Sequence, residues 1–143
     1  MTSTPSTPAP SAGLEGARRR RAALLARELF FKAQDLQRLG YSLPPAREGQ
    51  PRRRLPGLIS FWSGCEFLYP RWQFQGHTFV PRSHIATLLG VLPEDPTGWR
   101  LGFWLYQRHS LLNGARPADA FVHNPQNVLL AARSDFEPND TRW

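Results

Sequence analysis

The sequence predicts a mainly helical protein of the α+β class with one small β-hairpin. Three observations indicate this class. Apolar residues recur at helical spacing through most of the C-terminal half, two aromatic-rich runs flank a short loop that contains glycine, and prolines separate these segments. With 143 residues, of which 41% are hydrophobic and 20% charged, the chain has a globular composition and room for one ordinary domain or two very small ones.

The N-terminal part is expected to begin with a tail and continue as two helices. Residues 1–14 consist mostly of Ser, Thr, Pro, Ala and Gly without an apolar run, so a disordered tail is expected there. A helix is expected over residues 15–31, because the leucines between 24 and 29 form one apolar stripe. A second short helix is expected over residues 32–40, ending at Gly40.

A β-hairpin is expected next. Residues 58–62 and 66–69 are rich in aromatic and β-favouring side chains, and they flank the three-residue loop 63–65, which contains glycine. Pro70 is expected to end the second strand, because proline cannot donate a hydrogen bond to a neighbouring strand.

Four helices are expected in the C-terminal half. Residues 82–92 place apolar side chains at i, i+3, i+4 and i+7, with Ser83 as the N-cap and Pro93 at the end. Residues 99–106 are apolar on nearly all sides, so this helix is expected at the buried centre. The last two helices are expected over residues 117–122 and 124–136, followed by a loose tail at residues 137–143.

The charge of the chain is unevenly distributed. Residues 15–54 contain ten arginines and one lysine against four acidic residues, whereas residues 55–143 contain seven arginines against seven acids. A block this basic attracts polyanions in a salt-dependent way. The alternative is a solvated arginine-rich face in a chain that uses only one lysine. The candidate nucleic-acid contacts are Arg18, Arg19, Arg20, Arg21, Arg52, Arg53 and Arg54.

Several functional classes have no support in the sequence. The single cysteine, Cys65, cannot form an internal disulfide and fits a reducing compartment, and no apolar stretch approaches the roughly 18 residues of a membrane span. The four histidines show no metal-ligand spacing, and neither a glycine-rich phosphate loop nor paired carboxylates occur. We therefore expect a cytoplasmic protein that is not an enzyme and has no metal or cofactor. An arginine-rich transit peptide is the alternative for the N-terminus.

Phe31 to Ser42 resembles the opening helix and turn of a winged helix-turn-helix of the excisionase or MerR type. The recognition helix of that fold would follow near Ser42, and the hairpin would be its wing. Prolines interrupt this segment, and each interior proline costs a helix about 3 kcal/mol. Residues 15–73 are therefore expected to be a degenerate helix-turn-helix-like region, either a decayed DNA reader or a structural mount. The matching residues are Asp35, Leu36, Leu39, Gly40, Tyr41 and Ser42.

Three segments further along the chain carry a second resemblance. Tyr69–Phe74 reads Tyr-Pro-Arg-Trp-Gln-Phe, Gly98–Leu105 is rich in tryptophan and leucine, and Leu112–Phe121 contains a Leu-x-Gly-x-x-Pro turn before a helix start. Together they are similar to the Xre/MbcA/ParS-type toxin-binding domain at the C-terminus of bacterial antitoxins. The likeness covers about half of the chain. The chain departs from the family where Arg108-His109 replaces Pro-Asn and where Asn113 replaces a second glycine.

This resemblance implies a small helical bundle over residues 74–136 that binds and neutralises a protein toxin. Family members pair with RES-domain toxins, which consume NAD, and they often repress their own operons as dimers. By resemblance, the toxin-binding residues are Leu112, Asn113, Gly114, Arg116 and Pro117. One alternative is that this turn only connects two helices. A second is that the chain is a DNA-binding transcriptional regulator that acts through its basic half, and a third is an orphan protein without a partner.

Overall fold

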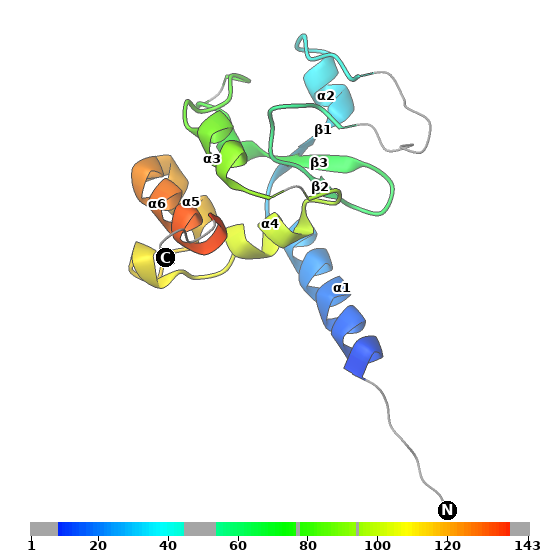
Figure 1. Cartoon of the computed structure of the whole chain (residues 1–143). Coiled ribbons are helices and arrows are strands. Elements are labelled where there is room, and N and C mark those ends of the chain that lie inside the picture. Colours follow the sequence, from blue (N-terminus) through cyan, green and yellow to red (C-terminus); the bar gives the residue numbers. More distant parts are fainter. Residues whose placement is uncertain (1–8, 45–53, 77, 94, 138–143) are drawn as a thin grey trace, which may run out of the picture.

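The computed structural model describes residues 9–44, 54–76, 78–93 and 95–137. These residues form six α-helices, two 3-10 helices and one three-stranded antiparallel sheet, so the protein belongs to the mixed α+β class. Helices α3, α5 and α6 lie together at one side of the sheet, while α1 projects from the body (Figure 1). The predicted class is confirmed at this level.

The first helix, α1, spans Ala9–Arg27, so the expected helix over residues 15–31 was wrong at both ends. It begins inside the predicted tail with an alanine and a proline, which are both tolerated in a first helical turn. It ends early because Phe30–Lys32 forms strand β1. The Phe30 ring packs edge-on against Phe61, at 6.1 Å between centroids. This contact would be lost if the helix continued through Phe30.

The sheet has the strand order β1-β3-β2, with β2 at Phe61–Trp62 and β3 at Phe67–Pro70. Both pairings are antiparallel, with Phe31 opposite Tyr69 and Phe61 opposite Leu68. The β2–β3 hairpin confirms the expected turn at residues 63–65, where the Ser63 N–H donates to the Glu66 carbonyl at 2.9 Å. Strand β1 is an addition that the local sequence pattern did not predict.

Helix α2 spans Ala33–Gln37, within the expected range of 32–40. Residues 41–44 and 54–60 are not helical. The remaining proline-containing segment, residues 45–53, lies outside the described part of the chain. The parts of the chain that the structure describes therefore contain no recognition helix between α2 and β2.

All four helices expected in the C-terminal half are present; three are shorter than expected, and α5 extends one residue further, to His123. Ser83 was expected to cap the first of them, but that helix begins at Ile85 and the Ser83 hydroxyl lies 3.2 Å from the His84 ring instead. The prolines expected at the starts of the last two helices are at their first positions. The elements are η1 (Arg71–Gln73), α3 (Ile85–Val91), α4 (Trp99–Leu105), η2 (Ser110–Leu112), α5 (Pro117–His123) and α6 (Pro125–Phe136).

Two apolar clusters hold these elements together. The smaller one lies around Leu36, Phe67 and Tyr69, between α2 and the sheet. The larger one joins Leu24 of α1 and Phe61 of β2 to buried side chains of α3, α4, α5 and α6. This larger core is continuous across the boundary at residues 73 and 74 that the sequence predicted between two domains, so the sheet and the C-terminal helices pack as neighbours.

Candidate partner-binding site

The turn that carries the resemblance is a closed loop between α4 and α5. Its two ends are joined by the His109 N–H, which donates to the Ala115 carbonyl at 3.1 Å, while the Gly114 N–H donates to the His109 carbonyl at 3.0 Å. Asn113 and Gly114 both have left-handed backbone conformations, with φ of 57° and 83°. Glycine and asparagine tolerate this region best, so the residue types at both positions suit the turn.

The side chain of Asp135, in α6, holds this loop in place. Its carboxylate accepts hydrogen bonds from the Trp104 indole at 2.7 Å and from the His109 ring at 2.8 Å. The other His109 ring nitrogen accepts the Leu111 N–H at 3.1 Å, so the proton is assigned to Nε2. The Trp104 bond, followed by the His109 bond, lowers the pKa of Asp135. His109, which departs from the family pattern, is therefore part of the support of the loop.

Only part of the predicted toxin-binding set is exposed. Asn113 and Gly114 face solvent, whereas Leu112 and Pro117 are buried against the helices. Leu111, which the sequence did not single out, has 57% of its surface exposed. The exposed part of the turn is therefore Leu111, Asn113 and Gly114, and we call these three residues the turn surface.

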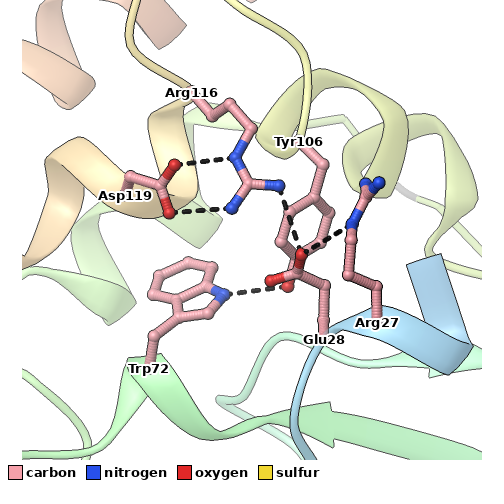
Figure 2. Close-up of polar contacts among 6 residues, drawn as sticks. All are labelled: Arg27, Glu28, Trp72, Tyr106, Arg116 and Asp119. Carbon is pink, nitrogen blue, oxygen red and sulfur yellow. Dashed lines mark hydrogen bonds and ion pairs between the residues drawn. The ribbon is translucent and has the colours of Figure 1, made fainter.

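Arg116, the fifth predicted residue, is held by carboxylates of the same chain. Its guanidinium donates two hydrogen bonds to Asp119, at 2.7 and 2.9 Å, and one to Glu28 at 3.2 Å. Figure 2 shows it between Asp119 and Glu28, close to the Tyr106 ring, whose centroid lies 5.3 Å away. These bonds raise the pKa of Arg116 and lower the pKa of Asp119. Arg116 therefore links α5 to the end of α1.

The three segments that carry the antitoxin resemblance meet beside this arginine. Trp72, from the first segment, donates its indole N–H to the Tyr106 hydroxyl at 2.9 Å (Figure 2) and packs on Phe121, from the third segment, at 5.6 Å between ring centroids. Tyr106 directly follows the second segment, and burial raises its pKa. Segments far apart in the sequence thus form one packed unit beneath the loop.

Gln73 has a role in stabilising the fold that the sequence did not predict. Its buried side chain accepts the Ile59 N–H at 2.7 Å and donates to the carbonyls of Ile59, at 2.8 Å, and Pro70, at 3.1 Å. It thereby satisfies main-chain groups of a buried segment that has no strand partner there. An amide between two aromatic residues, Trp72 and Phe74, is the signal that could have indicated this role.

The predicted nucleic-acid contacts fall into two groups. Arg18, Arg19, Arg20 and Arg21 lie on α1, where the first three are exposed and Arg21 is half-buried. Arg20 lies over the Phe103 ring, 4.7 Å from its centroid. Arg52 and Arg53 lie outside the described residues.

The Arg54 side chain forms hydrogen bonds with other parts of the protein. Its guanidinium donates to the Ser60 hydroxyl at 2.6 Å, the Ser60 carbonyl at 2.9 Å and the Asp95 carbonyl at 2.7 Å, and burial lowers its pKa. Gly98, with φ of 81°, approaches the same Ser60 carbonyl so closely that a Cβ atom would overlap it. Arg54 therefore holds the segment before β2, and its guanidinium makes these hydrogen bonds within the protein.

The described residues contain neither a candidate metal site nor a candidate membrane span. No group of three His, Cys, Asp or Glu side chains in this part of the chain could hold a metal ion. None of the described helices combines the length and the apolar character needed to cross a membrane.

Comparison of the chain with models of protein families, with curated proteins and with solved structures finds no match. The function is therefore inferred from the site geometry and from the motif resemblance.

Proposed function

We propose that the protein is an antitoxin-like cytoplasmic protein that binds and neutralises a partner toxin of the RES type through its C-terminal helical part. The observation that carries this proposal is the turn surface, where Leu111, Asn113 and Gly114 stand exposed on a loop that hydrogen bonds and packed side chains hold in place. A preorganised loop loses little conformational entropy when a partner binds, so more of the contact energy contributes to affinity.

The residues of the turn have different roles under this proposal. Leu111 supplies an apolar contact, and the Asn113 amide supplies donors and an acceptor at a position that faces solvent. Leu112 and Pro117 fix the shape of the loop from inside. Arg116 orients α5 through its pairs with Asp119 and Glu28, so its substitution is a poor probe of partner contact.

Co-expression of the full-length chain with the product of the adjacent reading frame tests this function. We expect the two proteins to co-purify as a stable complex on size-exclusion chromatography and, if the partner is a RES-type toxin, its NAD consumption to fall when the complex forms. The full chain is needed, because the larger core draws on both halves. Separate elution of two folded proteins, with the toxin still active in the mixture, would contradict the proposal.

A second candidate function, that of a DNA-binding transcriptional regulator, is favoured by the charge distribution. The net charge of +7 arises before residue 55, and α1 presents exposed arginines. The order α1, β1, α2 and hairpin supports the degenerate winged helix-turn-helix interpretation, with β2–β3 as the wing. The two functions are compatible, because an antitoxin that represses its own operon performs both, often as a homodimer.

A further inference from the structure

A basic groove runs between α1 and the tip of the β2–β3 hairpin. On the helix side it is lined by Arg18, Arg21, Ala22 and Leu25, which follow the i, i+3, i+4, i+7 spacing of a single helical face. On the other side it is lined by the hairpin turn, including Ser63 and Gly64. The groove has a volume of about 410 Å³.

Both walls of this groove are fixed by internal contacts. On the helix side, Leu25 packs against the larger core. On the hairpin side, the Trp62 N–H donates to the Thr97 carbonyl at 2.8 Å, and the Trp99 indole donates to the Trp62 carbonyl at 2.6 Å. The Ser63 hydroxyl donates to the Glu66 carbonyl at 2.8 Å and so closes the hairpin turn. A ligand would therefore meet a formed site.

The charged side chains that line the groove are both positive, Arg18 and Arg21. No carboxylate is among its lining residues, and neither Arg18 nor Arg21 is paired with an acidic side chain in the described part of the chain. Arg19, in contrast, belongs to the outward face of α1 with Ala26 and lies 4.0 Å from Glu15. Among the described residues, no acidic side chain neutralises the positive charge that faces the hairpin.

We propose that this groove binds the phosphodiester backbone of a nucleic acid, with Arg18 and Arg21 donating hydrogen bonds to phosphate oxygens. The proposal rests on the second candidate function and names the site and mode of binding. Open space surrounds the position that a Gly64 side chain would take, so a backbone can approach the hairpin turn closely. Arginine–phosphate contacts position a nucleic acid without reading its bases, which fits a chain without a recognition helix in its described residues.

An anionic membrane surface fits this groove less well. A helix that lies on a membrane needs an apolar face free to enter the lipid. In α1 the apolar side chains near the arginines are used inside the protein, because Leu24 is buried in the larger core and Leu25 packs against it. A ligand of this groove would therefore contact the charged side chains of α1 and no free apolar face of the helix.

Fluorescence anisotropy with the full-length protein tests the site. Labelled duplex DNA, single-stranded DNA and duplex RNA, each titrated at several salt concentrations, distinguish the sources of the phosphodiester. We expect Arg18→Glu and Arg21→Glu each to weaken binding about tenfold or more and to reduce the salt slope by about one. Arg19→Glu, which makes the same charge change on the outward face, should weaken binding clearly less than either groove variant at about 0.15 M salt, where the Debye length is about 8 Å.

A second matched pair avoids removing any arginine. Ala22→Glu places a carboxylate in the groove, whereas Ala26→Glu places it at an exposed position on the outward face. We expect only Ala22→Glu to weaken nucleic-acid binding, and we expect neither to change co-purification with the partner protein. Circular dichroism establishes that each variant is folded, and if an arginine variant unfolds, the alanine pair decides the question.

Three outcomes would overturn the proposal. Equal losses for Arg18→Glu and Arg19→Glu, or for the two alanine variants, would mean that diffuse net charge binds the polyanion outside any defined groove. Absence of binding to all three nucleic acids at low salt would remove the second candidate function together with the groove. Binding to phosphatidylserine vesicles without binding to nucleic acid would assign the charge to a membrane. The first outcome leaves nucleic-acid binding itself intact, and none of the three affects the toxin-binding proposal.

Discussion

Arginines in this chain differ in role according to what surrounds each guanidinium group. Arg54 is surrounded by carbonyl and hydroxyl oxygens of the interior, and Arg116 by two carboxylates and an aromatic ring. Arg18 and Arg21 have no acidic partner among the described residues. The first two therefore stabilise the fold, whereas the last two are the arginines to which the proposed groove assigns phosphate binding. Residue type alone does not separate these roles.

Substitution of Gln73 should destabilise the protein. Gln73→Leu leaves the buried Ile59 N–H and C=O without their side-chain partner, so we expect a loss of about 2–4 kcal/mol in the free energy of unfolding. Gln75→Leu, two residues away and exposed, should change it by less than about 0.5 kcal/mol. Urea denaturation followed by circular dichroism measures both, and similar midpoints for the two variants would refute the role assigned to Gln73.

Among the helices and strands, the sequence predicted those elements that are defined by interactions between residues close together in the chain. The hairpin, the four C-terminal helices and the turn at Gly114 depend on local spacing, proline and glycine, so the sequence predicted them. Strand β1 depends on pairing with β3, about 38 residues away, and the local pattern could not reveal it. Glu28, one of the two carboxylate partners of Arg116, is 88 residues distant in the sequence, and no local pattern could reveal this pair.

The same limit explains why Leu111, and not the predicted Leu112, belongs to the turn surface. Leu111 and Leu112 are neighbours of identical type, yet 57% of one and 7% of the other is exposed. Which of them points inward depends on the rotation of the short helix η2, and no periodic pattern of sufficient length surrounds it. Packing of η2 against α6 decides the matter in the structure.

The link between α1 and α5 should show itself in the pH dependence of stability. Arg116 lowers the pKa of Asp119, so the stability from this pair is present above the unfolded-state pKa of about 3.9 and is lost as the pH falls through the lower folded-state value. We expect Arg116→Gln to lower the unfolding midpoint at pH 6, with a difference from the wild type that narrows below about pH 4.

Thermal unfolding between about pH 6 and pH 2 measures this effect. The Asp119 side chain is 59% exposed, so solvent screening keeps the change small. Arg133→Gln is the matched control, because the Arg133 guanidinium lies 3.9 Å from Glu137 at an exposed helix end and should contribute little. A difference between Arg116→Gln and the wild type that stays constant across the whole range would show that the Asp119 pair does not stabilise the fold.

Across the whole molecule, the two proposed binding surfaces lie on different elements of one packed body. The groove is lined by α1, the hairpin and the start of α4, whereas the turn surface lies after the end of α4, on the loop before α5. Helix α1 and the C-terminal helices share the larger core, and the Arg116–Glu28 pair adds a polar connection between them. A toxin and a nucleic acid would therefore contact separate surfaces of a single folded unit.

The affinity of the full-length chain for the adjacent gene product, measured by isothermal titration calorimetry, tests the central claim most directly. Leu111→Asp changes the turn surface, and Leu130→Asp changes a leucine of α6 with nearly the same exposure, 60% against 57%. We expect Leu111→Asp to weaken binding at least tenfold, a loss of about 1.4 kcal/mol, and Leu130→Asp to leave it within about twofold. An unchanged affinity for Leu111→Asp, or equal losses for the two variants, would contradict the claim that this turn binds the partner.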